Sequence, residues 1–378
     1  MTKAVVIGGG IGGLTAAISL RRAGVEAAVF ERAPELREVG AGIALWANAA
    51  KALRKLGLYE AVRDRSAEIG GETRTWRGRK LFTITADEMR SRFGEANLVM
   101  HRADLQATLL AALPEDAVRL GAKLESFSQD GEAVVAHFSG GREETADFLV
   151  GADGLRSTVR ARLLGDGPPR YAGFMAWRGI AEGVEGLVPE GIGLNLWGRG
   201  MEFGLISIGR GRAYWYLSKN APEGGVEGPN KEEVLRNLRG WYGAARAAVQ
   251  ATEDSGILRN DIYDREPARR WGEVNATLLG DAAHPMTPNL GQGACQAIED
   301  AVVLADAVRQ TDSAAAALRS YEARRIRRTG AVVRASRNMA RVMQIEAPLL
   351  CSVRDAGFRL MPAGVMMGRL DPIVRYEV

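Results

Sequence analysis

The sequence predicts an α/β protein, with a parallel-sheet domain that is interrupted by a mostly antiparallel β-sheet domain and followed by C-terminal helices. Three observations predict this fold class. A glycine-rich turn at residues 8–13 joins a short apolar strand to a helix of small residues. Between residues 171 and 262 helical periodicity fades, and aromatic and β-branched runs take its place. A buried-strand pattern then returns at residues 276–279, ahead of two long helices.

The N-terminal elements come in the order strand, helix, strand, at residues 4–7, 12–23 and 26–31. Two strands joined by a helical crossover pair in parallel, so this unit opens a parallel sheet. Helices are expected next at residues 49–56 and 103–112, and strands at 118–127, 133–138 and 145–150.

The interrupting region has strands at residues 191–197, 203–208 and 213–217, with one helix at 231–247. Helices at 295–308 and 315–342 follow the returning strand. We place the parallel-sheet domain at residues 1–72, 95–168 and 262–345, the β-sheet domain at 73–94 and 169–261, and a helical tail at 346–378.

The composition is that of an ordinary globular protein, and 378 residues are enough for two domains. A net charge of +4 is too small to require a nucleic-acid partner. Cys295 and Cys351 form no disulfide framework, so a cytoplasmic location is expected. The three histidines lack metal-ligand spacing, so we expect no metal site. No run of about 18 apolar residues is present, so we expect no membrane-spanning helix.

The glycine-rich turn fits the pattern G-x-G-x-x-G, which binds the pyrophosphate of a dinucleotide. Gly8 permits the tight turn, Gly10 lets the backbone approach the pyrophosphate, and Gly13 lets the helix pack closely on the strand. Glu31 ends the second strand, where its carboxylate can accept hydrogen bonds from ribose hydroxyls. The residues assigned to this site are Gly8, Gly10, Ile11, Gly12, Gly13 and Glu31. The fingerprint alone does not separate FAD from NAD.

A second segment, residues 280–295, reads as a strand end, a proline-stiffened loop, a glycine hinge and a helix start. Asp281 follows the buried strand, where a carboxylate can accept hydrogen bonds from a polyol. Gly291 and Gly293 let the backbone come close to a planar ring, and the following helix directs its positive end at whatever precedes it. These features suit a flavin. The alternative is that prolines and glycines merely shape a strand-to-helix loop.

A third segment places Asp153-Gly154 directly after the strand that ends at Val150. An acid at a strand end followed by glycine usually makes a turn. Alternatively, Asp153 orients Arg156 or Arg160 near phosphates. Taken alone, this segment supports neither reading over the other.

Together these three segments resemble the class A flavoprotein aromatic monooxygenases, the p-hydroxybenzoate hydroxylase-like group. The pattern is most similar to salicylate, 3-hydroxybenzoate, 6-hydroxynicotinate and urate hydroxylases and to zeaxanthin epoxidase. The match that begins at residue 280 extends to residue 301, and shorter matches lie at residues 40–43, 102–105 and 176–179. They span residues 1 to about 330 and specify the family far better than the substrate.

The resemblance implies a Rossmann-like, GR2-type FAD-binding domain and an inserted substrate domain. It implies bound FAD, transient NADPH or NADH, and O2, with one oxygen atom passing through a flavin hydroperoxide to a phenolic or heteroaromatic ring. The protein would supply orientation and a dry pocket. Three alternatives stay open: an epoxidase of a lipophilic polyene or quinone-type substrate, a flavin oxidase or dehydrogenase, and a non-catalytic FAD-binding protein.

The resemblance also implies roles for individual residues. Glu31 would hold the adenosine ribose, Arg102 the pyrophosphate or ribityl region, and Leu124 would lie beside the adenine through its backbone. Asp281 would bind the ribityl chain, and Pro288 would lie on the substrate side of the flavin. The remaining implied contacts are Arg32, Gly42, Ala44, Asp153 (shared with NAD(P)H), Gly291, Gly293, Ala294 and Cys295.

Three departures from the family pattern concern specificity. Ala47 stands where many relatives have proline, and Cys295 where asparagine or alanine is more usual, although some urate-hydroxylase-like members have cysteine. Urate enzymes carry an arginine over the flavin on a strand that matches residues 200–208, but this chain has Met201-Glu202 there. The resemblance therefore does not favour urate as substrate.

The inserted sheet is expected to cover the substrate, with aromatic faces and one cation from Trp177, Arg178, Phe203, Tyr214 and Trp215. Neighbours on a strand point to opposite sides, and we expect Tyr214 to face the substrate, because a tyrosine aligns there in relatives. The alternative is that these aromatics pack the sheet on itself. Catalytic candidates are Tyr214, Arg178 and Pro288. His284 is a proton relay or a loop residue satisfied by backbone.

The arginine-rich helix at residues 321–341 is interpreted as a solvated face with internal ion pairs. The apolar tail is expected to pack over the substrate domain. Contact of the tail with lipid or with a second subunit stays open, as does the choice between monomer and homodimer.

Overall fold

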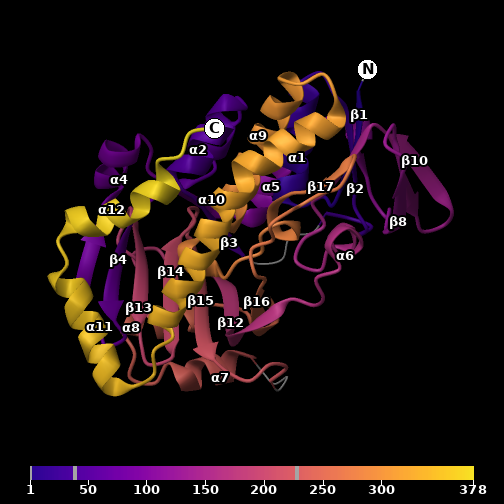
Figure 1. Cartoon of the computed structure of the whole chain (residues 1–378). Helices are drawn as coiled ribbons and strands as arrows, with labels where there is room; N and C mark the ends of the chain where they lie inside the picture. The colour runs from indigo at the N-terminus through magenta and orange to yellow at the C-terminus, as the bar shows by residue number, and fades with distance from the viewer. Residues whose placement is uncertain (1, 37–40, 226–229) are drawn as a thin grey trace.

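The computed structural model describes residues 2–36, 41–225 and 230–378, and it has two sheet-based halves bridged by long C-terminal helices (Figure 1). One half is a five-stranded sheet in the order β17-β11-β1-β2-β7, and all its pairs are parallel. Its strands are β1 (Lys3–Ile7), β2 (Glu26–Phe30), β7 (Val118–Arg119), β11 (Phe148–Gly151) and β17 (Ala276–Leu278). The predicted α/β fold class is confirmed.

The helices of this half are α1 (Ile11–Arg22), α2 (Ala47–Lys55), α3 (Tyr59–Arg63), α5 (Arg102–Leu110), α6 (Thr158–Leu164) and α9 (Gly293–Arg309). The apolar side chains of the parallel strands pack with those of α1 and α9 in one continuous buried core. A small sheet of β8 (Leu124–Gln129), β9 (Val134–Phe138) and β10 (Arg142–Ala146) lies at its edge. The single strand expected at residues 118–127 is therefore two strands, with Gly121 at φ 67° between them.

The other half is a nine-stranded, mostly antiparallel sheet in the order β16-β12-β15-β14-β13-β4-β6-β3, with β5 added beside β4. Its strands are β3 (Gly42–Leu45), β4 (Ala67–Thr75), β5 (Lys80–Ile84), β6 (Asn97–His101), β12 (Arg170–Glu182), β13 (Ile192–Trp197), β14 (Met201–Ser207), β15 (Arg212–Asn220) and β16 (Leu258–Asp264). Strands β3, β4 and β6 precede β12 by a long stretch of chain, so two distant segments build one sheet.

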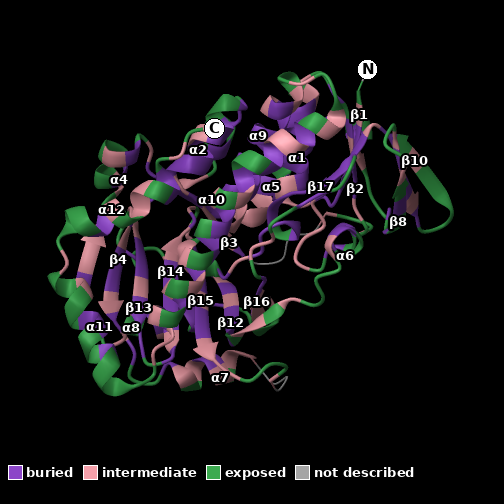
Figure 2. Ribbon diagram, in the orientation of Figure 1, coloured by how far each residue is buried: buried purple, intermediate pink, exposed green. Residues whose placement is uncertain are grey.

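Two short helices, α7 (Asn230–Asn237) and α8 (Gly243–Gln250), contribute with one face of this sheet to a second buried core. A single helix was expected at residues 231–247. It is broken around Gly240, whose φ of 74° lies in the left-handed region that ends helices. Figure 2 shows the resulting pattern of buried strands beneath a more exposed periphery.

The C-terminal helices are α10 (Ala314–Met343), α11 (Pro348–Leu360) and α12 (Ala363–Val374). In Figure 1 α10 runs from the parallel half to the large sheet, and α11 lies beside β4 and β5 at the molecule's edge. Phe358 of α11 packs edge-on against Trp197 at 4.7 Å between ring centroids. Helix α12 packs beside α2 and near α4 (Ala86–Phe93).

Candidate functional site

In the glycine-rich turn, glycine is required at two positions because a β-carbon would clash with the backbone, and a third position borders open space. Gly8 has φ +108°, and a β-carbon there would lie 2.4 Å from the Ala152 carbonyl oxygen. A β-carbon on Gly13 would lie 1.9 Å from the Gly8 carbonyl oxygen. A β-carbon on Gly10 would meet nothing within 4 Å. The turn therefore leaves open space directly before the N-terminus of α1, where free N–H groups attract an anion.

Glu31 lies beside this space, at the end of β2. Its two carboxylate oxygens accept hydrogen bonds from the Gly9 N–H at 2.7 Å and the Ala33 N–H at 2.9 Å. The Glu31 backbone also pairs with the segment before Leu124, because its carbonyl accepts from the Ala122 N–H at 2.8 Å. The fold thus brings Glu31 and Leu124 to one edge of the turn, while Arg32 is exposed.

Asp153 caps helix α6. Its carboxylate accepts hydrogen bonds from the Ser157 hydroxyl and from the Thr158 N–H at 2.7 Å. Arg160 is buried and donates to the Ala282 carbonyl at 2.9 Å and the Ala283 carbonyl at 2.8 Å, so it ties α6 to the second segment. The reading in which Asp153 orients Arg160 toward phosphates is therefore wrong.

Several positions of the second segment that are expected to face a ligand are open to solvent. Asp281, Pro288 and Gly291 are exposed, and Gly293 and Ala294 are partly exposed, as are three further residues, Met286, Asn289 and Leu290. A β-carbon built on Gly293 would lie 3.7 Å from Asp281 Oδ1, so this carboxylate lies at the start of α9. Although Asp281 is exposed, the surrounding protein removes enough hydration to raise the pKa of its carboxyl, against the opposing charges of His284 and Arg102.

Strand β3 closes one side of this loop. Gly42 and Ala44 are partly exposed, and a β-carbon on Gly42 would lie 2.6 Å from the Tyr214 ring. Cys295 is fully buried, its thiol 3.5 Å from the Trp46 nitrogen and 3.7 Å from the Ala44 oxygen. Burial raises the pKa of the Cys295 thiol to about 12, so it is unreactive. Any cofactor contact at Cys295 would come from its backbone. Gly40, in the matched segment 40–43, lies outside the described residues.

The large sheet presents Tyr214 and Arg178 on one face. Tyr214 pairs with Ile180, and Arg178 pairs with Tyr216, so all four share a side. Burial raises the pKa of the Tyr214 hydroxyl, and the nearby charges of Arg178 and Arg102 oppose the shift. Arg178 donates to Asn260, but its Nε has no partner among the described residues. The structure therefore brings the tyrosine and the arginine together.

Trp177, Phe203 and Trp215 lie on the opposite face, in the core beneath α7 and α8. Their expected place beside the substrate is wrong: Trp177 and Trp215 alternate with Arg178 and Tyr214, and Phe203 pairs with Leu217 on the core face. For these three, the alternative that aromatics pack the sheet on itself holds.

The sequence analysis missed Glu202 as a member of the Tyr214 face. Its Oε1 accepts hydrogen bonds from Asn195 at 2.8 Å and from the Tyr216 hydroxyl at 3.0 Å. The side chain is 2% exposed, and burial raises the pKa of its carboxyl. Strand alternation places Tyr216 on the same face as Tyr214. No sequence signal gives the register between β14 and β15, which brings Glu202 onto that face.

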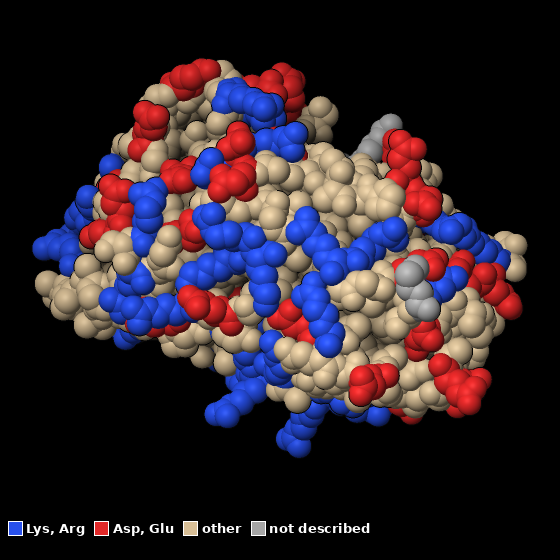
Figure 3. Space-filling model, turned by 90° about the horizontal axis from the view of Figure 1, so that it is seen from above, with Lys and Arg blue, Asp and Glu red and all other residues tan. Residues whose placement is uncertain are grey.

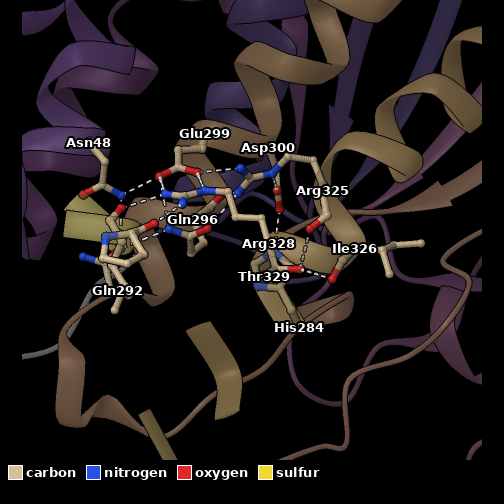
Figure 4. Close-up of polar contacts among 12 residues, drawn as sticks. Asn48, His284, Gln292, Gln296, Glu299, Asp300, Arg325, Ile326, Arg328 and Thr329 are labelled. Carbon is tan, nitrogen blue, oxygen red and sulfur yellow. Dashed lines mark hydrogen bonds and ion pairs between the residues drawn. The ribbon is translucent and has the colours of Figure 1, made fainter. Parts of the chain in front are cut away.

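A buried ionic network lies behind the second segment (Figure 4). Arg325 binds Asp300 at 2.6 Å and Glu299 at 2.5 Å, and His284 Nε2 lies 2.6 Å from Asp300. Burial alone would raise the pKa of Asp300, but His284 and Arg325 lower it to about 2. The His284 ring therefore contacts the Asp300 carboxylate, whereas one of the two expectations had its side chain bound by backbone groups.

Helix α10 matches the expected solvated face with internal ion pairs only in part: Arg319 pairs with Glu322 on the same helix, but other arginines turn inward. Arg325, Arg328 and Arg337 pair with acids on other elements. Four more remain exposed: Arg324, Arg327, Arg334 and Arg341. Figure 3 shows basic side chains crossing the middle of the upper face, with acidic ones between and around them. This helix thus holds the two halves of the molecule together.

Two further structural findings bear on the site. The described part of the chain contains no group of three or more histidine, cysteine, aspartate and glutamate side chains arranged to hold a metal ion. Within the same residues, no helix combines the length and apolar character needed to span a bilayer.

Comparison with known proteins gives both a family and a fold. A family model described as an FAD binding domain matches residues 1–336. Aurachin C monooxygenase/isomerase from Stigmatella aurantiaca is 43% identical over 359 residues, 94% of each protein. An FAD-dependent urate hydroxylase of Klebsiella pneumoniae is 34% identical over 332 residues, 85% of each. The crystal structure of Klebsiella pneumoniae HpxO complexed with FAD and uric acid matches with TM-score 0.93 and 31% identity, over 99% of this chain and 97% of that one.

Proposed function

The chain belongs to the FAD-binding-domain family, together with FAD-dependent hydroxylases and monooxygenases, and from this premise we propose that it inserts one oxygen atom of O2 into a phenolic or heteroaromatic small molecule. FAD is the cofactor, and the chain is an oxidoreductase. NADPH or NADH is the proposed reductant. The observation that carries the proposed reaction is the contact of Gly42 with Tyr214. Gly42 lies on β3, beside the loop expected to bind the cofactor, and Tyr214 lies on the polar face of the large sheet. The contact therefore brings the cofactor loop next to the expected substrate position.

The residues present fit FAD. The open space at Gly10 and the N-terminus of α1 suit the pyrophosphate. Glu31 keeps acceptor capacity for a ribose hydroxyl, since a carboxylate offers about four lone-pair sites and two are used here. Asp281, exposed at the start of α9, suits the ribityl hydroxyls, and the helix end suits the pyrimidine edge.

We propose the other FAD contacts from the positions of the residues in the fold. Arg102 acts on the pKa of both Asp281 and Tyr214, which sets it between the ribityl and substrate positions. Pro288 and Gly291 are exposed on the same loop as Asp281. Arg32, Leu124 and Asp153 flank the nucleotide end.

Tyr214 and Arg178 are the proposed substrate contacts. When bound, FAD supplies the oxygen-activating chemistry, and the chain orients the ring and excludes water. The Tyr214 hydroxyl can exchange a hydrogen bond with a substrate hydroxyl. The unpartnered Arg178 Nε is a buried donor, which costs about 1–3 kcal/mol unless an acceptor reaches it. A substrate oxygen meets that need, and a nearby cation favours the electron-rich phenolate.

Urate is not the substrate we propose. On the polar face this chain has buried Glu202, whose carboxyl has a raised pKa and hydrogen bonds to Asn195 and Tyr216. This acid lies on the strand where the resemblance implies an arginine in the urate enzymes, so the polar face lacks that cation. The relative named for aurachin C, at 43% identity, supports a substrate other than urate.

Substrate-stimulated NAD(P)H oxidation, measured with product formation across a panel of phenols, quinolones and polyenes, tests this function. Tyr214→Phe should lower kcat by about tenfold or more and leave FAD affinity unchanged, because it removes one hydrogen bond at the ring. Tyr263→Phe, which loses only a bond to exposed Glu223, is the control. Full turnover by Tyr214→Phe would remove this residue from the site.

The remaining alternatives give different readouts in the same assay. An oxidase or dehydrogenase consumes NAD(P)H or substrate without oxygenated product, and a non-catalytic FAD-binding protein shows no substrate-stimulated consumption. Epoxide formed from a polyene would favour the lipophilic alternative. We propose a cytoplasmic location because both cysteines are free and buried.

A further inference from the structure

Helices α11 and α12 expose apolar side chains to an unusual degree. Five of the eight exposed large apolar side chains among the described residues lie on these two helices. They are Leu349 at 76%, Leu350 at 54%, Val353 at 62%, Leu360 at 76% and Val365 at 51% exposure. Scattered exposed apolar residues need no explanation, but a contiguous group marks a binding surface.

Helix α11 exposes an apolar face to solvent. Leu349, Val353 and Leu360 are spaced i, i+4 and i+11, so they share one face, and that face points away from the protein. The inward face carries Phe358, which packs against Trp197, together with a buried ion pair of Arg354 and Asp355 at 2.9 Å. A helix with leucines outside and an ion pair inside is arranged for an apolar surface beyond the protein.

The charged side chains around this face are mostly basic. From residue 347 to 370 the sequence contains a single acid, the buried Asp355. Arg359 and Arg369 are exposed on α11 and α12, and exposed Arg199 is close enough to act on the Cys351 pKa at the start of α11. The acids around these helices are engaged by other groups: Glu346 accepts from Asn220, Asp371 of α12 pairs with Arg92, and Asp87 and Glu88 are bound within α4 by Arg90 and by the helix cap at Thr85.

We propose that the outer face of α11 and the start of α12 docks on an anionic lipid bilayer. The leucines and valines enter the boundary between headgroups and acyl chains, and the arginines bind lipid phosphates. A second copy of this chain fits less well. A symmetric pair would set the same basic rim against itself with no exposed acid of these helices to meet it, whereas lipid supplies the missing anions.

The test is co-sedimentation of the FAD-loaded protein with vesicles of phosphatidylcholine alone and with phosphatidylglycerol added. We expect sedimentation with the anionic vesicles, weaker with neutral vesicles and weaker at high salt. The double variant Leu349→Glu, Leu360→Glu should bind at least tenfold more weakly. Leu120→Glu, at a 43% exposed leucine in the turn after β7, is the matched control and should bind like the wild type. Retained FAD shows that each variant is folded.

Three outcomes would overturn the proposal. Wild-type protein could stay in the supernatant with both kinds of vesicle, or the double variant could sediment as well as the wild type. Light scattering could instead show a dimer that the double variant dissociates, with no vesicle binding, which would make this face an interface between copies. None of these outcomes bears on oxygen insertion, which is measured separately in solution.

Discussion

Two aspartates, Asp281 in the second segment and Asp300 in the helix α9 that follows it, have opposite environments. Asp300 is fully buried, yet His284 and Arg325 lower its pKa to about 2. Asp281 is exposed, yet its pKa is raised, because loss of hydration at the carboxyl outweighs the opposing charges of His284 and Arg102. Partners, rather than depth, decide which carboxylate stays charged. We call the buried network around Asp300 the closed end and the exposed surroundings of Asp281 the open end. Protein groups alone bind the carboxylate at the closed end, whereas the carboxylate at the open end is accessible to a ligand.

The closed end is a network in which each buried charge meets several groups. Glu299 accepts from Arg325, Arg328 and Asn48, while Asp300 accepts from Arg325, His284 and the Gly280 N–H (Figure 4). Removing one partner would leave the others buried and unpaired. The comparison therefore predicts large stability effects at the closed end and large binding effects at the open end.

Arg325→Met should have the largest effect. It leaves Glu299 and Asp300 without their main buried cation, which costs about 3–5 kcal/mol in the free energy of unfolding. Urea denaturation of the apoprotein measures it. Arg324→Met removes an exposed neighbour on the same helix and should change stability by less than about 0.5 kcal/mol. Equal, small changes in both variants would contradict a structural role for the network.

Acid should weaken the closed end next. The pKa of Asp300 falls from 3.8 to about 2 on folding, so its contribution is complete above pH 4 and is lost as the pH falls through 2. That contribution is about 2 kcal/mol. Asp300→Asn should remove this part of the pH dependence of stability between pH 4 and 2. An unchanged slope in the variant would show that Asp300 does not titrate as described.

Asp281→Asn should have the smallest effect on stability and a clear effect on binding. Loss of a charged acceptor weakens FAD binding by roughly tenfold to a hundredfold. Because burial already disfavours the Asp281 charge, the apoprotein should be as stable as the wild type or slightly more so. Flavin fluorescence titration gives the affinity, and denaturation gives the control. A variant that is less stable but binds FAD as tightly as the wild type would show that Asp281 supports the fold rather than the cofactor.

The sequence predicted the open end better than the closed end. Local rules sufficed for Gly8 and Gly13, whose conformations and close contacts exclude a side chain, and for the opposite directions of Tyr214 and Trp215. Pairing across long separations was beyond such rules. His284, Asp300 and Arg325 meet only through the packing of α9 on α10, and a helical pattern of arginines does not show which ones turn inward.

The register of the large sheet was equally inaccessible. Glu202 shares a face with Tyr216 only because β14 pairs with β15 at one particular offset. Both Trp177 and its neighbour Arg178 were expected beside the substrate, although neighbours on a strand point to opposite faces. Periodicity gives the two faces of a strand, and only tertiary packing says which face is the core.

The central claim is that the open end of the segment holds FAD. The most direct test is the flavin content of the purified protein, followed by titration of the apoprotein with FAD. The account predicts equimolar FAD in the holoprotein, saturable rebinding after its removal, and weaker rebinding by Asp281→Asn. A colourless protein that takes up no FAD on reconstitution would contradict it.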